Sequence, residues 1–91
     1  MTPLQKLLRW QADPSLLDDP GYDAPTPETI IKAIEVAKNL DMAFSSCVPD
    51  GNGEICFSRF DGQAYESITV SPDGIERTVL KNWLVVEREP L

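Results

Sequence analysis

The side chains that could carry out chemistry in this chain are two cysteines, Cys47 and Cys56, and 15 carboxylates. Histidine is absent, which excludes Ser-His-Asp and Cys-His nucleophile systems and the usual His-containing zinc sites. Two cysteines cannot supply a Cys₄ zinc site or an iron–sulfur cluster. The only basic residue close to either cysteine in the sequence is Arg59, so neither thiol has an obvious activating cation. We therefore expect no catalytic residue, no metal and no cofactor.

The carboxylates suggest turns and ion pairs more than a reaction centre. Segment 50–54 reads Asp-Gly-Asn-Gly-Glu, but it lacks the flanking helices and the bidentate glutamate of a calcium-binding EF-hand. A hairpin turn accounts for this segment. Catalysis by a carboxylate pair would need two carboxylates that converge in a partly dry pocket. The spacing of the acidic residues in this sequence does not require any two of them to converge in this way. We expect Arg59, Glu66 and Arg77 to form a paired charge at the rim of a sheet.

The overall charge narrows the choice of partners. The chain has 91 residues, 8 basic and 15 acidic side chains, and a formal charge of −7. This balance opposes binding to nucleic acid or to an anionic membrane. The longest apolar runs have about four residues, too few to span a bilayer, and the start of the chain does not resemble a signal peptide. We expect one cytoplasmic domain, residues 1–91, with reduced thiols.

Three segments precede the region in which apolar and polar residues alternate. Residues 1–12 are expected to form a short helix, with Thr2 as its cap and Gln5 completing a capping box. Residues 13–26 are acidic and rich in proline, and we expect them to wrap the surface through Leu16, Leu17 and Tyr22, or to form an acidic interaction loop. Residues 27–41 show the apolar period of a helix whose stripe faces a core.

From Phe44 onward the apolar period changes from that of a helix to that of a strand. Asp-Gly pairs at 50–51, 61–62 and 73–74 are strong hairpin signals, and a fourth turn is expected at 81–82. The predicted strands are 44–49, 54–60, 63–71, 75–80 and 83–88. We therefore predict an α+β domain in which one long helix packs on a four- to five-stranded antiparallel meander (44–88), with a short N-terminal helix.

Two-residue turns at these positions predict the register of the sheet. Ile68 would lie opposite Ile55 and Val79, and Val79 opposite Leu84. One face would then collect the apolar set Ile55, Phe57, Ile68, Val70, Val79, Leu84 and Val86. The first hairpin permits a loop at 51–52 or at 52–53. Both loops place Val48 on the core face and both cysteines on the opposite face.

The opposite face gathers four apolar residues at one end, which we call the corner: Tyr65, Leu80, Trp83 and Val85. An apolar patch of this kind must be covered or used. The N-terminal helix could cover it by burying Leu7 and its leucine neighbours against Trp83. Alternatively, the corner is an interface with a partner protein or with a second copy, because Trp and Tyr are favoured anchors of interfaces.

Two stretches of the sequence carry a resemblance. Segment 21–30 contains a Gly-Tyr-x-Ala-Pro helix start, and segment 49–57 contains a Pro-Asp-Gly turn leading into an apolar strand. Together they resemble a group of small uncharacterised bacterial proteins over residues 20–80. In that group an acidic-aromatic pair often follows the strand, whereas this chain has Ser58-Arg59-Phe60. The resemblance implies a helix followed by a β-meander and no particular activity.

These patterns favour a binding role over catalysis. We expect a small acidic cytoplasmic protein-interaction module of antitoxin, immunity or regulatory type, which binds through the corner or the acidic segment. The alternative is a self-associating structural subunit, a homodimer that uses the corner symmetrically. A small enzyme is less consistent with the sequence, because no nucleophile–base constellation can be assembled.

Overall fold

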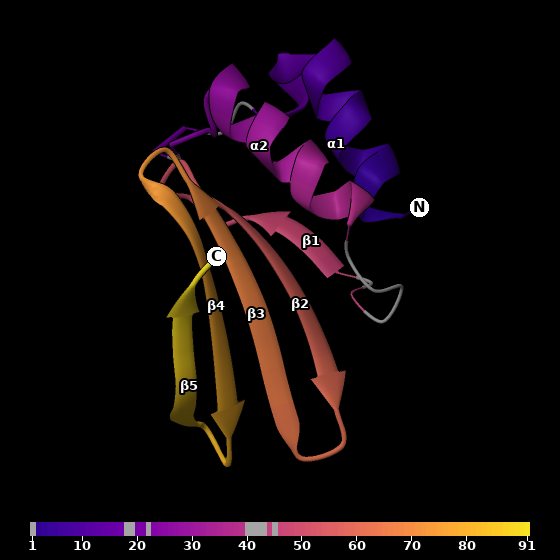
Figure 1. The fold of residues 1–91 in the computed structure, drawn as a ribbon. Coiled ribbons are helices and arrows are strands. Elements are labelled where there is room, and N and C mark those ends of the chain that lie inside the picture. The colour runs from indigo at the N-terminus through magenta and orange to yellow at the C-terminus, as the bar shows by residue number, and fades with distance from the viewer. Residues whose placement is uncertain (1, 18–19, 22, 40–43, 45) are drawn as a thin grey trace.

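The structure is a computed structural model that describes residues 2–17, 20–21, 23–39, 44 and 46–91 (Figure 1). Its elements are α1 (Pro3–Ala12), a 3₁₀ helix η1 (Pro14–Leu17), α2 (Pro27–Lys38), β1 (Ser46–Pro49), β2 (Ile55–Asp61), β3 (Ala64–Ser71), β4 (Gly74–Lys81) and β5 (Leu84–Pro90). The strands form one antiparallel sheet in the order β1-β2-β3-β4-β5. The predicted α+β class and five-stranded meander are confirmed.

Both α-helices are short, so the prediction of one long helix is wrong. α1 has 10 residues and α2 has 12. Thr2 and Gln5 form the predicted capping box at the start of α1. α2 ends at Lys38, where Asn39 donates its side-chain amide to the carbonyl of Glu35 at 2.9 Å. The remaining positions of that predicted helix, 40 and 41, lie outside the described residues.

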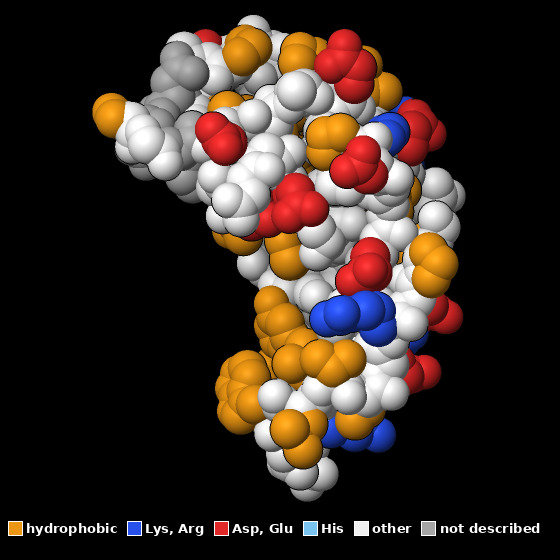
Figure 2. Space-filling model, turned by 90° about the vertical axis from the view of Figure 1, so that its left-hand side faces the viewer, with side chains coloured by type: hydrophobic (Ala, Val, Ile, Leu, Met, Phe, Trp, Pro, Cys, Tyr) orange, Lys and Arg blue, Asp and Glu red, His pale blue; other side chains and the backbone are white. Residues whose placement is uncertain are grey.

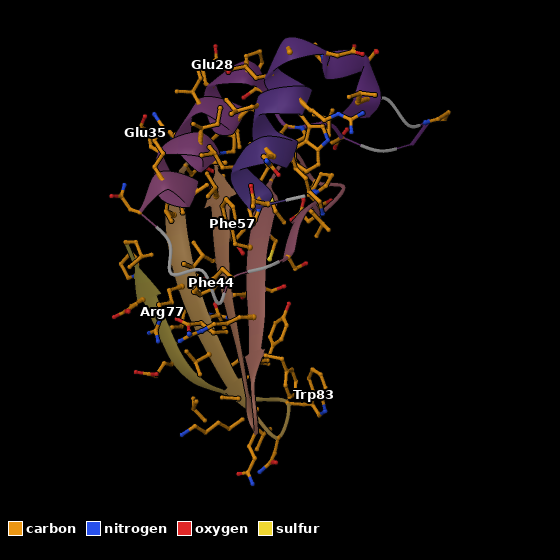
Figure 3. All side chains as sticks on the ribbon, turned by 90° about the vertical axis from the view of Figure 1, so that its right-hand side faces the viewer. Glu28, Glu35, Phe44, Phe57, Arg77 and Trp83 are labelled. Carbon is orange, nitrogen blue, oxygen red and sulfur yellow. The ribbon has the colours of Figure 1, made fainter. Side chains whose placement is uncertain are left out.

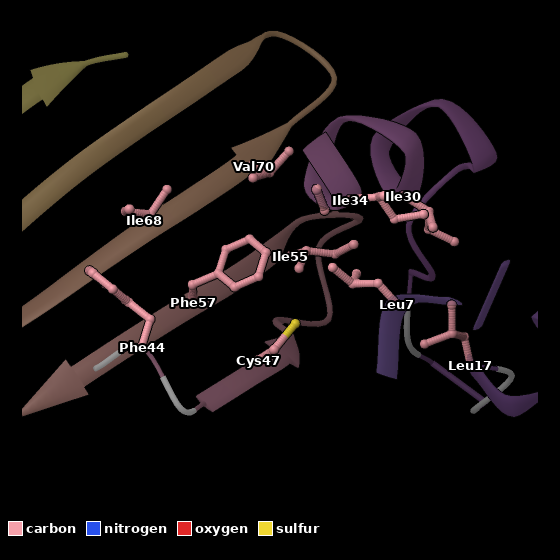
Figure 4. Close-up of a cluster of buried hydrophobic side chains, with 11 residues drawn as sticks. Leu7, Leu17, Ile30, Ile34, Phe44, Cys47, Ile55, Phe57, Ile68 and Val70 are labelled. Atoms are coloured by element: carbon pink, nitrogen blue, oxygen red, sulfur yellow. The ribbon is translucent and has the colours of Figure 1, made fainter. Parts of the chain in front are cut away.

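The core lies between the two helices and one face of the sheet, at the end of the sheet that the helices cover. Its buried side chains come from all layers: Leu7, Leu17, Ile30, Ala33, Ile34, Phe44, Cys47, Ile55, Phe57, Ile68 and Val70 (Figure 4). α1 contacts α2, η1 and β1, and α2 also contacts β2 and β3. The helices cover only one end of the sheet, and β2, β3 and β4 extend well beyond them (Figure 1).

Most described residues of the acidic proline-rich segment are exposed. Leu17 is buried and is one of the expected anchors, whereas Leu16 is exposed and Tyr22 lies outside the described residues. The segment is joined to the β1–β2 loop by backbone hydrogen bonds. The N–H of Asp23 donates to the carbonyl of Gly51 at 3.1 Å, and the N–H of Gly53 donates to the carbonyl of Asp23 at 2.8 Å.

The register of the three later hairpins differs from the prediction by two residues. Ile55 lies opposite Val70, and Ile68 lies opposite Arg77. An even shift leaves the side chains of β2, β3 and β4 on their predicted faces, because successive side chains alternate between faces. The shift arises in the turns, which use the pairs 62–63, 72–73 and 82–83 instead of the pairs predicted.

Two residues of β5 that the sequence assigns to the core, Leu84 and Val86, are exposed, and one of them lies in a β-bulge. Leu80 lies opposite Val85, but Val79 lies opposite Glu87, which leaves Val86 as the extra residue. Leu84 is 70% exposed and Val86 is 50% exposed, so their prediction as core residues is wrong. β5 is an edge strand beyond the reach of the helices, and all seven of its residues are exposed.

In the first hairpin the register differs from the prediction by an odd number of residues, which moves each side chain of β1 to the opposite face of the sheet. The loop of this hairpin is 50–54, so Cys47 lies opposite Phe57 and Val48 lies opposite Cys56. Cys47 is therefore buried in the core and Val48 is exposed, the reverse of the prediction. The Asp50 carboxylate stabilises this longer loop by accepting the N–H of Asn52 at 2.8 Å and that of the following Glu54 at 3.2 Å. The two thiols are free and lie on opposite faces.

The predicted ion pairing at the rim is confirmed. Glu66 lies directly opposite Arg59 and accepts hydrogen bonds from both Arg59, at 2.7 Å, and Arg77. The Arg59 guanidinium also lies 5.1 Å from the centre of the Phe44 ring. These groups lie on the helix side of the sheet, next to the core and toward the end that the helices leave uncovered.

Candidate functional site

The corner lies on the sheet face that points away from the helices. Direct cross-strand pairs join Phe60 to Tyr65, Tyr65 to Leu80 and Leu80 to Val85, so an apolar row crosses β2 to β5. Trp83 comes from the β4–β5 turn and lies on the opposite side of the sheet from Phe44 and Arg77 (Figure 3). Hydrophobic side chains gather at this end of the molecule (Figure 2).

Three aromatic rings form a cluster in the corner. The ring centroids of Phe60 and Tyr65 are 6.4 Å apart, those of Phe60 and Trp83 6.5 Å, and those of Tyr65 and Trp83 6.4 Å. The corresponding angles between ring planes are 55°, 52° and 37°. Phe60 is 64% exposed and Trp83 is 76% exposed. The three rings lie close together, while a large part of Phe60 and of Trp83 faces solvent.

The three rings line a small cavity of about 150 Å³ that is open to solvent. Its lining residues are Phe60, Gln63, Tyr65, Leu80, Asn82 and Trp83. The rings and Leu80 supply apolar walls, and the amides of Gln63 and Asn82 are the polar groups of this lining. Aromatic walls with a few polar groups are common features of ligand sites, but at about 150 Å³ this one is smaller than the usual pocket for a whole small molecule and has room only for a small group.

The backbone at Trp83 is unusual for so large a residue. Asn82 and Trp83 have φ angles of 52° and 63°, as both central residues of a type I′ turn must. Asn-Gly is the favoured pair in such a turn, and a residue with a Cβ costs about 1–2 kcal/mol in the left-handed region. The structure therefore places a tryptophan where glycine would be more stable. Strain of this kind is often found at functional sites.

Among the described residues, α1 does not cover the corner, so that prediction is wrong. Leu7 is fully buried, but in the core between α1, α2 and the sheet. Leu4 packs against the same core, and Leu8 is 46% exposed. The sequence alone could not decide this point, because the apolar face of α1 has the same period whichever face of the sheet it covers.

The structure brings the four predicted corner residues to one end of the sheet and adds others. Tyr65, Leu80 and Trp83 line the cavity, whereas Val85 pairs with Leu80 and is 51% exposed beside it. Phe60, Gln63 and Asn82 were not predicted as part of the site. Strand alternation from Phe57 already places Phe60 on this face, but the predicted register paired it with Gln63 instead of Tyr65.

The charges around the corner are few. Segments 58–67 and 78–87, which form this end of the sheet, contain two cations and three carboxylates, a net charge of −1, although the whole chain carries −7. By strand alternation, Arg59 lies on the same face as Phe57 and Lys81 on the same face as Val79, which is the helix side of the sheet. In the part of the chain that the structure describes, no Lys or Arg lines the cavity.

Further concave regions lie near the helical end, and two of them have a distinctive lining. One, of about 470 Å³, has three carboxylates in its lining, those of Glu54, Asp73 and Glu76. A hydrogen bond with Asp50, with burial and the neighbouring carboxylates, raises the pKa of Glu54. The other is an apolar groove of about 580 Å³ between α2, β3, β4 and Leu91. Among the described residues, no group of three or more Cys, Asp or Glu side chains could hold a metal ion.

Neither thiol has the environment of a nucleophile. Burial raises the pKa of Cys47 to about 12, and the nearby Lys6 charge only partly opposes this effect. Burial also raises the pKa of Cys56, against the smaller effect of a hydrogen bond with Thr69. Both thiols are therefore protonated at neutral pH, and the reactive species of a cysteine nucleophile is the thiolate.

The fold and the corner define an α+β protein with two short helices on one end of a five-stranded meander and an exposed aromatic pocket at the other. No family model matches the chain, and no curated protein or solved structure matches it either. The resemblance to a group of small bacterial proteins stays a prediction. Of the helices that the structure describes, none is long and apolar enough to span a membrane.

Proposed function

We propose that this chain is a small acidic interaction module, of antitoxin, immunity or regulatory type, that acts in the cytoplasm and binds another protein through the corner. The observation that carries the proposal is the exposed aromatic cluster on the face away from the helices. Trp83 and Phe60 are each more than 60% exposed, yet they are held in contact with Tyr65. Such preorganised Trp and Tyr side chains are typical of the residues that dominate binding energy.

Exposed hydrophobic area alone would be a weak argument, because single apolar residues are common on protein surfaces. The corner differs because side chains from β2, β3, β4 and the β4–β5 turn converge on one cavity, and Val85 of β5 lies beside it. They also lie where local charge is low, which suits the apolar centre of an interface. The rest of the acidic surface would discourage non-specific contacts with other acidic molecules.

The corner is a better candidate than the acidic segment for the binding surface. The end of that segment is held by backbone hydrogen bonds between Asp23 and the β1–β2 loop, and Leu17 anchors it in the core. These contacts account for the segment as part of the folded structure. We further propose a role without catalysis, supported by the protonated thiols and by the absence of histidine from the sequence.

The variant Trp83→Asp tests the proposal. Trp83 is 76% exposed, and aspartate tolerates the left-handed backbone of this turn, so we expect a cooperative melt close to that of the wild type. The matched control is Leu16→Asp, because Leu16 is an exposed apolar residue of η1, which lies at the helical end. All three proteins would be tagged and used to capture partners from a lysate of the source organism.

A captured protein would then be purified and titrated directly by calorimetry. We expect Trp83→Asp to weaken its binding at least about tenfold, the loss typical of a hot-spot residue, and Leu16→Asp to leave it unchanged. Equal binding by all three proteins would overturn the proposal. The alternative, a homodimer through the corner, predicts a doubled mass in sedimentation that Trp83→Asp returns to that of the monomer.

A further inference from the structure

We propose that the corner is an aromatic cage for a methylated ammonium group. The group would be carried by a free quaternary ammonium compound or by a methylated lysine side chain. Phe60, Tyr65 and Trp83 would supply the walls and Leu80 the apolar floor. This inference deepens the proposed function by naming the chemical group that the corner takes, and it rests on that function where the group belongs to a partner protein.

The spacing of the rings suits a cation. The three centroids form a nearly equilateral triangle with sides of 6.4, 6.5 and 6.4 Å. A cation centred above this triangle, about 3 Å toward solvent, would lie about 5 Å from every centroid, within the ~6 Å range of cation–π attraction. The angles of 55°, 52° and 37° between the ring planes show that no two rings are stacked in parallel. By these centroid distances, a group bound above the triangle would lie within this range of all three rings at once.

The volume of the cavity suits a methylated ammonium group. An open cavity of about 150 Å³ has room for a group of a few heavy atoms. Tetramethylammonium and the head of trimethyllysine each have five heavy atoms. A methylated ammonium group is also more weakly hydrated than a bare ammonium group and makes apolar contacts through its methyl groups, which a wall of rings and leucine can accept.

Electrostatics favour a cation over a neutral or acidic ligand. The faces of aromatic rings are negative, and the chain as a whole carries −7, which attracts cations over long distances. Gln63 and Asn82 line the same cavity. A quaternary ammonium group has no N–H to donate, so an amide oxygen there would attract it only through its partial negative charge. The cavity lining contains no Lys or Arg among the described residues, so no cation of the chain itself is seen to occupy the cage.

The turn provides a second, independent observation. Trp83 adopts a φ of 63° in a turn whose favoured second residue is glycine. A smaller side chain would suit the hairpin better, but it would remove one wall of the cavity. A binding role for its ring would explain why a tryptophan occupies this strained position.

The experiment is a titration followed by two-dimensional ¹H–¹⁵N NMR. Choline is the cationic probe, and 3,3-dimethyl-1-butanol, its neutral isostere, is the control ligand. We expect choline to shift the indole N–H of Trp83 and the amides of Phe60 and Tyr65, with a dissociation constant on the order of 1–10 mM. Trp10 packs against the core at the other end of the molecule, so its indole signal is an internal reference that should not move.

The neutral alcohol should bind at least about fivefold more weakly than choline, the factor that one ordinary cation–π contact supplies. Trp83→Gly should remain folded and lose the choline response. Tyr65→Leu keeps an apolar wall but removes an aromatic ring. It should therefore weaken the binding of choline more than the binding of the alcohol. Equal binding of choline and the alcohol, or an undiminished choline response in Trp83→Gly, would overturn the cage.

A second titration identifies the source of the group. A peptide with trimethyllysine that binds more tightly than choline, and more tightly than the same peptide with unmodified lysine, would assign the cage to a protein ligand. Equal or weaker binding of that peptide would assign it to a free quaternary ammonium compound. If choline binds while no protein partner depends on Trp83, the cage stands and the proposed function fails. If a partner depends on Trp83 while choline does not bind, the proposed function stands and the cage fails.

Discussion

The substitution Glu66→Gln removes the central charge of the ion cluster on the helix side of the sheet. Glu66 is only 8% exposed, and its two carboxylate oxygens accept hydrogen bonds from Arg59 and Arg77. Glutamine has nearly the same size and shape, so the substitution leaves the packing of β3 unchanged. It replaces one accepting oxygen by an amide that can only donate, and this amide would face a guanidinium.

The size of the effect follows from the burial of the three partners. A hydrogen bond to a charged group contributes about 1.5–3 kcal/mol when its partners are buried. The side chains of Arg59 and Arg77 are 28% and 26% exposed, so water compensates part of the loss. Arg77 also keeps its contact with Glu89 at 3.0 Å. We therefore expect Glu66→Gln to lower the free energy of unfolding at pH 7 by about 1–3 kcal/mol.

The same cluster predicts how this difference depends on pH. Burial alone raises the pKa of Glu66, but the hydrogen bonds and charges of Arg77 and Arg59 outweigh burial and hold the pKa below its usual range. The folded state thus binds this proton less readily than the unfolded state. Its contribution to stability is complete above the ordinary glutamate pKa of about 4.3. The contribution is lost as the pH falls through the lower pKa of the folded state.

Urea unfolding of both proteins at pH 7 and at pH 3, followed by circular dichroism, measures this effect. The gap between wild type and Glu66→Gln should be smaller at pH 3, since only the wild-type residue titrates. Glu35→Gln is the matched control, because Glu35 is an exposed glutamate paired with Lys38 at 3.4 Å. It should change the stability by less than about 0.5 kcal/mol. Equal stability of Glu66→Gln and wild type at pH 7, or a gap that stays constant to pH 3, would refute the reasoning.

Two further predictions concern the core. Leu7→Ala should destabilise the protein by about 2–5 kcal/mol, because Leu7 is fully buried, whereas Leu8→Ala, at a position 46% exposed, should cost less than about 1 kcal/mol. Urea midpoints measure both, and equal losses would show that α1 is not packed as described. In a thiol titration at pH 8, Cys47 should react only after unfolding because it is buried and its pKa is about 12. Native Cys56 should react more slowly than free cysteine, and rapid reaction of two thiols in the native protein would contradict this assignment.

Much of the sheet could be predicted because local signals determine where chains turn. All five strands were predicted to within two residues at either end. The turn types required more than the Asp-Gly pattern. Gly62 has a φ of 60° while Gln63 is not in the left-handed region, which is the pattern of a type II′ turn. Pro72 favours the first central position of a turn, which moves that turn ahead of Gly74.

The first hairpin could not be predicted because its loop depends on contacts distant in sequence. Gly51 and Gly53 both adopt positive φ, at 89° and 80°, and the Asp50 carboxylate accepts two loop N–H groups. Asp23, which is 28 positions before Gly51, adds backbone hydrogen bonds to the same loop. A five-residue loop results, and its odd length decides which of Cys47 and Val48 enters the core.

The unequal lengths of the two layers explain why the corner is not part of the core. α2, at about 1.5 Å per residue, is about 18 Å long, whereas the eight residues of β3 span about 26 Å. The two helices pack side by side at one end of the sheet (Figure 1), so the far end has no layer to bury apolar side chains. On the helix side of that end the sheet carries the Glu66 ion cluster, whose charges tolerate partial solvent exposure. On the other side it carries aromatic rings, which gain nothing from such exposure. Cross-strand pairs of this kind stabilise a sheet by about 0.2–1 kcal/mol each, which accounts for Phe60 and Tyr65. It does not account for a tryptophan that is 76% exposed at a positive φ in the β4–β5 turn, so Trp83 is the residue that a ligand would best explain.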